Sequence, residues 1–112
     1  MALAGTLKLN KLIVLYDSNK ICLDGKVEDV NSVDMPKYFS SLNWNVLMAD
    51  GEDINSIDNA ITRAKQGLLP TIIIVNTTIG KHSKYEGTNY IHGAKLSKED
   101  ITEIKNELGL RD

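Results

Sequence analysis

Three short apolar runs stand out along the chain, and each has the length of a single strand. Residues 11–16, 45–49 and 71–75 consist mainly of aliphatic side chains, and polar residues follow each run. Unbroken apolar runs of about four to eight residues are typical of strands that are buried on both faces of a parallel sheet. The pattern therefore predicts three strands.

Apolar residues at helical spacing lie between and after these runs. Ser32 and Asp53 each precede such a segment, and both are favoured N-cap residues because their side chains accept hydrogen bonds from the first backbone N–H groups. Ser97 and Asp100 have the spacing of a capping box at the start of a last helix. A further short helix is expected to end near Lys8.

Strands that alternate with helices imply a parallel sheet with right-handed crossovers. We therefore expect an α/β fold with three layers, helix–sheet–helix, and a short, mostly parallel sheet. Three strands are few for such a sheet, so one edge would expose unpaired backbone unless a partner covers it. Residues 21–31 show no helical period and are expected to be an irregular connection. Residues 76–96 form a long polar loop, and loops of this length are commonly functional.

Length and composition narrow the class of protein. The 112 residues suit one domain, and 42% apolar with 25% charged residues is ordinary for a folded chain, so general disorder is excluded. A net charge of −2 gives no overall attraction to nucleic acid or anionic lipid. One cysteine, Cys22, and the lack of a long apolar segment lead us to expect a reducing, cytoplasmic location without a membrane span.

The segment after the first strand contains candidate metal ligands. Residues 17–21 offer an Asn amide oxygen and backbone carbonyl oxygens, which are hard donors that suit Mg²⁺ or Ca²⁺. Two neutral donors need added negative charge, which Asp17 or a group outside the chain could supply. The alternative is that residues 17–19 merely turn the chain, as Asp, Ser and Asn often do.

Both histidines of the chain lie in the long loop. A histidine beside flexible backbone can contact a phosphate or transfer a proton near neutral pH, although surface loops also collect histidine without a catalytic role. We expect His82 to be exposed and favour His92, which lies between Ile91 and Gly93, as the functional residue. Cys22 is interpreted as a small apolar filler.

The chain as a whole resembles transketolase, in order and with no large gap. The similarity covers residues 3–19 with Ile21 and residues 23–25, then Asn43, Trp44 and Val46, and the stretch Asp50, Gly51 and Asp53 with Ile57, Ala60 and Ile61. It continues through Pro70, Thr71, residues 78–80, Ser83, residues 86–88 and residues 92–94.

This resemblance implies a thiamine-diphosphate-binding fold over residues 1–112, present only in part. Transketolases are transferases of the pentose phosphate pathway that move a two-carbon ketol unit between sugar phosphates. By position in the family pattern, Asn19 and Ile21 match ligands of the divalent cation, Mg²⁺ or Ca²⁺, that holds the diphosphate. His92 matches a histidine that contacts the diphosphate and assists near the reactive carbon of the cofactor.

The sequence also departs from the family pattern. The Gly-Asp-Gly segment that supplies the acidic metal ligand would precede Met1, and the pyrimidine-binding domain and the sugar-phosphate-binding residues are not in this sequence. His82 stands where the family has glycine in Gly-x-Gly-Ser, and Lys95 stands where it has proline. We therefore expect a fragment that is inactive alone, binds no cofactor tightly, and has a mobile segment between Gly80 and Tyr90.

Two other interpretations remain open at this point. The chain could be a non-catalytic binding module that uses an exposed sheet edge. It could also be one subunit of a split transketolase that needs a partner chain. In either case a homo-oligomer or a missing partner domain would cover the incomplete sheet.

Overall fold

The computed structural model describes residues 1–22, 25–29 and 31–111. The chain divides into two compact units. The first comprises Met1–Ser18 and Val33–Thr77, and the second comprises Asn19–Ser32 and Thr78–Asp112. Leu23 and Asp24, which belong to the stretch that resembles transketolase, lie outside the described residues.

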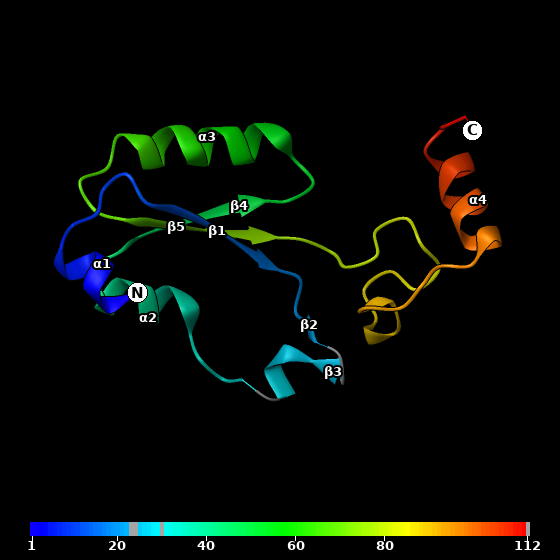
Figure 1. The fold of residues 1–112 in the computed structure, drawn as a ribbon, viewed down its shortest axis with the longest axis horizontal. Coiled ribbons are helices and arrows are strands. Elements are labelled where there is room, and N and C mark those ends of the chain that lie inside the picture. The colour runs from blue at the N-terminus through cyan, green and yellow to red at the C-terminus, as the bar shows by residue number, and fades with distance from the viewer. Residues whose placement is uncertain (23–24, 30, 112) are drawn as a thin grey trace. The chain divides into compact units, whose positions relative to one another are not determined.

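A parallel sheet of three strands forms the centre of the first unit (Figure 1). Its strands are β1 (Ile13–Ser18), β4 (Asn45–Asp50) and β5 (Thr71–Asn76), in the order β1-β5-β4. Thr71 of β5 lies opposite Ile13 on one side and Asn45 on the other. All three predicted strands are therefore confirmed, and each ends one or two residues later than the apolar run suggested.

Helices cover both faces of this sheet (Figure 1). On one face, α3 (Ile54–Lys65) contributes Ala60 and Ala64 to a core with Ile73 and Val75 of β5. On the other face, α1 (Ala2–Thr6) and α2 (Met35–Ser41) pack with Trp44 against Ile72 and Ile74. The predicted three-layer α/β architecture is confirmed.

The strands differ in burial because they differ in position. The side chains Thr71 to Val75 of β5 are all buried, as a central strand with two covered faces requires. Leu15 of β1, in contrast, is 51% exposed, and Met48 of β4 is 56% exposed. The expectation that each apolar run is buried on both faces is therefore wrong for β1 and β4, which are the edge strands of this sheet.

The helix caps test the predicted boundaries. Asp53 caps α3 by accepting a hydrogen bond from the Asn55 N–H at 3.0 Å, as predicted. Ser32 does not cap α2; Asp34 does, accepting from the Lys37 N–H at 3.0 Å. A helix that began at Ser32 would put Pro36 in its interior, where the proline ring clashes with the carbonyl one turn earlier.

The second unit contains small elements that carry less sequence signal. A hairpin of β2 (Ile21–Cys22) and β3 (Gly25–Lys26) is followed by η1 (Val27–Asp29), so residues 21–31 are more regular than predicted. The long loop contains one short 3₁₀ helix, η2 (Asn89–Ile91), and leads to α4 (Lys98–Glu107). Ser97 and Asp100 form the predicted capping box at the start of α4. The side chain of Cys22, which is predicted to be a small apolar filler, lies outside the described part of the structure.

Replacing Gly5 with alanine tests how closely α1 packs in the first unit. A Cβ atom at Gly5 would lie 1.7 Å from the carbonyl oxygen of Leu42, which is backbone and cannot rotate away. We expect Gly5→Ala to lower the free energy of unfolding by about 2–4 kcal/mol. Urea denaturation followed by the fluorescence of Trp44, which is buried in the same unit, measures the change.

The matched control is Thr6→Ala on the exposed side of the same helix, which should change the free energy of unfolding by about 0.5 kcal/mol or less. A Gly5→Ala variant as stable as the Thr6→Ala variant would contradict this packing of α1.

Candidate cofactor-binding site

The two predicted metal ligands lie in one tight turn. Asn19 follows the last residue of β1, and its Oδ1 atom accepts a hydrogen bond from the Ile21 N–H at 3.0 Å. Lys20, between them, has a φ of 64°, a left-handed conformation that costs a residue other than glycine about 1 kcal/mol. A turn is therefore present, but it begins at Asn19, because Asp17 and Ser18 still belong to β1. The turn fixes the Asn19 side chain against the backbone.

The hairpin also decides where the Ile21 carbonyl points. Val27 donates its N–H to the Lys20 carbonyl at 2.9 Å, and Ile21 is the next residue along, opposite Lys26. Hydrogen-bonded and non-hydrogen-bonded pairs alternate in an antiparallel ladder, so the N–H and C=O of Ile21 point away from β3. The Ile21 N–H bonds Asn19, so the Ile21 carbonyl oxygen and Asn19 Oδ1 lie on the same side of the hairpin.

This donor set fits a hard cation in kind but not in charge. An amide oxygen and a carbonyl oxygen on one side of a hairpin are ligands that Mg²⁺ and Ca²⁺ accept. Neither brings negative charge, and the Asp17 carboxylate accepts a hydrogen bond from the Thr77 hydroxyl in the first unit. Within the described residues, no three His, Cys, Asp or Glu side chains gather as a metal site would require. Asn19 and Ile21 would therefore hold a cation only with help from a charged group.

The loop that leads to His92 is closed by its own hydrogen bonds. Gly87 donates its N–H to the Ile79 carbonyl at 2.8 Å. The buried Ser83 donates its N–H (2.9 Å) and its hydroxyl (2.6 Å) to the Gly80 carbonyl. Gly80 has a φ of 65°, and a Cβ atom there would lie 2.7 Å from the side chain of Ile91. The start of the loop therefore packs directly against the residue that precedes His92.

His92 lies immediately after η2 and is half-buried. Its N–H donates to the Asn89 carbonyl at 3.2 Å. The position of its imidazole ring thus depends on η2 and on the contact between Gly80 and Ile91. Asn19, Ile21 and His92 all belong to the second compact unit, where they come from two separate segments of the chain.

His82 is placed differently from the exposed position that we predicted. It is half-buried, and its Nδ1 atom lies 3.0 Å from Oε1 of Glu107 on α4. Its N–H donates to Glu86 Oε2 at 2.8 Å, and this hydrogen bond, ahead of the nearby Lys81, lowers the pKa of Glu86. The φ of His82 is 68°, which explains physically why glycine suits this position.

An ion pair also connects the loop to α4, and no sequence pattern predicts it. Lys84 Nζ lies 2.6 Å from Oδ1 of Asp100, a contact better described as an ion pair than as an aligned hydrogen bond. Asp100 is 5% exposed, and its Oδ2 atom accepts from the Ser97 N–H at 2.9 Å. Lys84 first, and then Ser97, lower the pKa of Asp100 to about 2, and Asp100 raises the pKa of Lys84. The capping-box spacing was the only sequence signal that marked Asp100.

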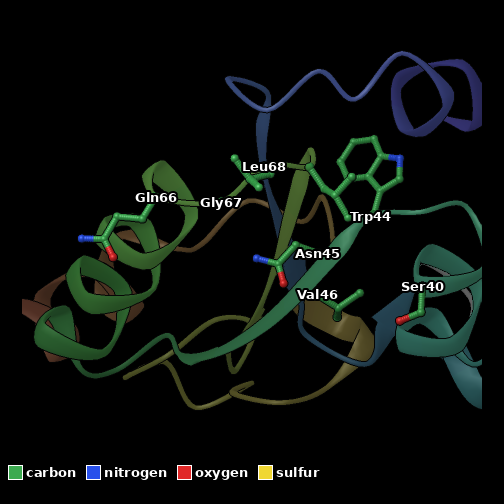
Figure 2. Close-up of a pocket in the computed structure, with 8 residues that line it drawn as sticks. Ser40, Trp44, Asn45, Val46, Gln66, Gly67 and Leu68 are labelled. Carbon is green, nitrogen blue, oxygen red and sulfur yellow. The ribbon is translucent and has the colours of Figure 1, made fainter.

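The first unit has an open hollow beside β4 (Figure 2). Ser40 of α2 and the segment after α3 line it together with the start of β4. Its lining contains no acidic, basic or histidine side chain and none of the predicted site residues: it consists of Ser40, Trp44, Asn45, Val46, Gln66, Gly67, Leu68 and Leu69. The hollow offers packing surface and amide groups but no group for acid–base chemistry.

Comparison with known proteins identifies the family of this chain. Residues 1–112 match the family described as "Transketolase, thiamine diphosphate binding domain". The chain is 47% identical over 109 residues to the transketolase of Staphylococcus epidermidis, which covers 96% of the chain and 16% of that protein. It is 44% identical over 110 residues to transketolase 1 of Aliivibrio fischeri. The chain therefore belongs to the thiamine-diphosphate-binding domain family of transketolases.

Solved structures agree with this assignment. Transketolase from Leishmania mexicana superposes with a TM-score of 0.93 at 37% identity, covering 97% of this chain and 17% of that one. Transketolase from Campylobacter jejuni superposes with a TM-score of 0.94 at 35% identity. The chain thus spans about a sixth of the length of the relatives that it matches. In the part of the chain that is described, no helix is long and apolar enough to cross a membrane.

The depressed pKa of Asp100 gives a prediction about acid stability. Its pKa of about 2 in the folded chain lies below the ordinary value of 3.8. On acidification, Asp100 is therefore protonated at a higher pH in the unfolded chain than in the folded chain. We expect the stabilisation from Asp100 to be complete above about pH 4 and to disappear as the pH falls towards about 2. Urea denaturation of the wild type and Asp100→Asn across this range measures it, and the two proteins should converge at low pH.

The same replacement at the exposed Asp58 on α3 controls for the general effect of removing a carboxylate. A difference between wild type and Asp100→Asn that stayed constant throughout the acid range would contradict the prediction.

Gly80→Ala tests how the loop sets the position of His92. The new methyl group would meet Ile91 at 2.7 Å in a backbone conformation that disfavours alanine. We expect a loss of about 1–3 kcal/mol in the stability of the loop, with changed amide chemical shifts at Ile91 and His92. Two-dimensional NMR reads both effects.

Gly109→Ala is the matched control, because Gly109 has a φ of 67° but no atom within 4 Å of the new Cβ. It brings the backbone strain without the clash and should leave the His92 signal unchanged. A Gly80→Ala spectrum with an unshifted His92 signal would rule out this contact as the positioning element.

Proposed function

We propose that this chain supplies part of the thiamine-diphosphate site of a transketolase, the transferase that moves a two-carbon ketol unit between sugar phosphates. The main support is the family match over residues 1–112. The matched domain is described by the cofactor that it binds, and 47% identity to a transketolase extends over nearly the whole chain. The positions of Asn19, Ile21 and His92 indicate which chemical role each residue would have.

The proposed roles follow from the donor types. Asn19 Oδ1 and the Ile21 carbonyl oxygen would each give one neutral ligand to Mg²⁺ or Ca²⁺, and the cation would hold the diphosphate group. The hydrogen bond from the Ile21 N–H to Asn19 supports this role, because it orders the amide before a cation arrives. Thiamine diphosphate, when bound, supplies the carbanion that acts as nucleophile and electron sink.

His92 is proposed to act on the diphosphate and near the reacting carbon. A neutral or protonated imidazole can donate a hydrogen bond to a phosphate oxygen, and the ring can hold or release a proton close to neutral pH. The half-burial of His92 supports this role because a partly desolvated ring interacts more strongly with a charged ligand. Its backbone is held by η2, so the ring would approach the ligand from a defined direction.

The charge that these donors lack is proposed to come from outside residues 1–112. The relatives are about six times as long as this chain, which covers 16% of one and 17% of another. We propose that a missing partner domain, or a homo-oligomer as a whole transketolase, supplies the acidic metal ligand, the group that activates the cofactor and the sugar-phosphate-binding residues. We further propose a cytoplasmic location, where sugar phosphates are available.

A binding module without catalysis is the second candidate. It is favoured by exposed apolar residues of α1, of the segment that follows it, and of β1, which is an edge strand of the described sheet: Leu3, Leu7, Leu9, Leu12 and Leu15. Light scattering after size-exclusion chromatography tests this second candidate by measuring the oligomeric state of the chain at several concentrations. A monomer at all concentrations would argue against a module that associates through this edge.

The proposal predicts that the isolated chain neither transfers ketol units nor binds thiamine diphosphate at micromolar concentrations. Two neutral ligands cannot offset the desolvation of a divalent cation and a diphosphate. Calorimetric titration with thiamine diphosphate and Mg²⁺ should therefore give no micromolar isotherm. A clear micromolar isotherm would show that residues 1–112 contain a complete site.

At millimolar cofactor with Mg²⁺, weak binding should appear as NMR shift changes around Asn19 and His92. Asn19→Ala should remove the dependence of these changes on Mg²⁺, while Asn59→Ala on the exposed side of α3 should leave it intact. Shift changes confined to other residues would count against the proposed roles of Asn19, Ile21 and His92.

A further inference from the structure

Two side chains of the loop reach to α4, and they do so from neighbouring positions. His82 contacts Glu107 in the last turn of the helix, with 3.0 Å between Nδ1 and Oε1. Lys84 contacts Asp100 in the first turn, with 2.6 Å between Nζ and Oδ1. The loop is thus tied to both ends of one ten-residue helix.

The Lys84–Asp100 pair is not a by-product of helix capping. The capping box uses Oδ2 of Asp100, which accepts from the Ser97 N–H, while Lys84 meets the other oxygen, Oδ1. The carboxylate is 5% exposed, so removal of Lys84 would leave a buried charge without its cation. This differs from an ordinary surface pair, in which both groups remain hydrated and the contact contributes little.

His82 adds an observation of a different kind. Its left-handed φ of 68° is unfavourable for a residue with a side chain. The strain persists together with two contacts, from the ring to Glu107 and from the backbone N–H to Glu86. A strained conformation that survives this way is held by its surroundings, which here include α4.

We propose that α4 acts as an anchor that holds the loop of residues 79–91 in the conformation that sets the position of His92, with Lys84 and Asp100 as positioning residues. The connection from Lys84 to His92 is local. Gly87 and Ser83 bond the start of the loop on either side of Lys84, and Ile91 packs on Gly80. The anchoring of the loop does not depend on a cofactor. Only the role of His92 in cofactor binding rests on the proposed function.

Amide hydrogen exchange of the full chain, recorded by NMR without cofactor, tests the anchor. The reporters are the N–H groups of Gly87, which bonds Ile79, and of His92, which bonds Asn89. We expect Lys84→Gln and Asp100→Asn each to speed their exchange by about three- to tenfold, because the loop opens more often. Lys84→Arg, which keeps the cation, should stay within about twofold of the wild type.

The double variant Lys84→Gln/Asp100→Asn separates the ion pair from other effects, including the contact of Lys84 with the Tyr85 ring. If the two residues act through one contact, the double variant should exchange no faster than the faster single variant. Ser97→Ala removes the hydroxyl of the capping box and should speed exchange at the start of α4 without reaching Gly87 or His92. Wild-type exchange in Lys84→Gln, or fully multiplied effects in the double variant, would overturn the proposal.

The outcome is independent of the cofactor titration. Exchange that responds to Lys84 while thiamine diphosphate fails to bind even at millimolar concentration would support the anchor and count against the proposed function. Cofactor-dependent shifts at His92, together with hydrogen exchange that is unchanged in Lys84→Gln, would support the proposed function and count against the anchor.

Discussion

The central strand β5 is the constraint on which the first unit depends. It pairs in parallel with β1 on one side and β4 on the other, and its side chains alternate between two cores. Ile72 and Ile74 face α1 and α2, while Ile73 and Val75 face α3. Because all of these side chains are buried, a shift of one residue in register would exchange the two cores, so the register is strongly specified.

That register also fixes where the two segments of the second unit begin. Neighbouring parallel strands end at the same edge of a sheet. The two segments of the second unit begin at these strand ends, one after Ser18 and the other after Thr77. The two ends are neighbours, because the Thr77 N–H donates to the Ser18 carbonyl at 3.3 Å. The metal-ligand turn and the histidine loop therefore start from adjacent strand ends.

The sequence was informative where a signal repeats along the chain or where a single residue carries it. Three aliphatic runs predicted the three strands, and Asp53 and Ser97 marked two helix starts because capping depends on one side chain at one position. The hairpin at residues 21–26 was missed because strands of two residues have no period to detect. The helix α2 does not start after Ser32 because Pro36 would then lie inside the helix and clash with the preceding turn.

The candidate site was predictable only in part, for a related reason. The types of donor at Asn19 and Ile21 can be read from residue identity, but their shared direction depends on the pairing of β2 with β3. The contacts of Lys84 with Asp100 and of His82 with Glu107 join residues 16 and 25 positions apart, and no pattern connects these positions. Such contacts depend on where a loop folds back, which periodicity does not describe.

The left-handed backbone at His82 also affects the unfolded chain. Glycine explores more of conformational space than any other residue and therefore loses more entropy when a loop becomes ordered. A histidine in its place narrows the unfolded ensemble, which offsets part of the strain that it carries in the folded loop. In this chain, the loop before His92 is thus stabilised in part because the unfolded polypeptide has fewer conformations available at His82.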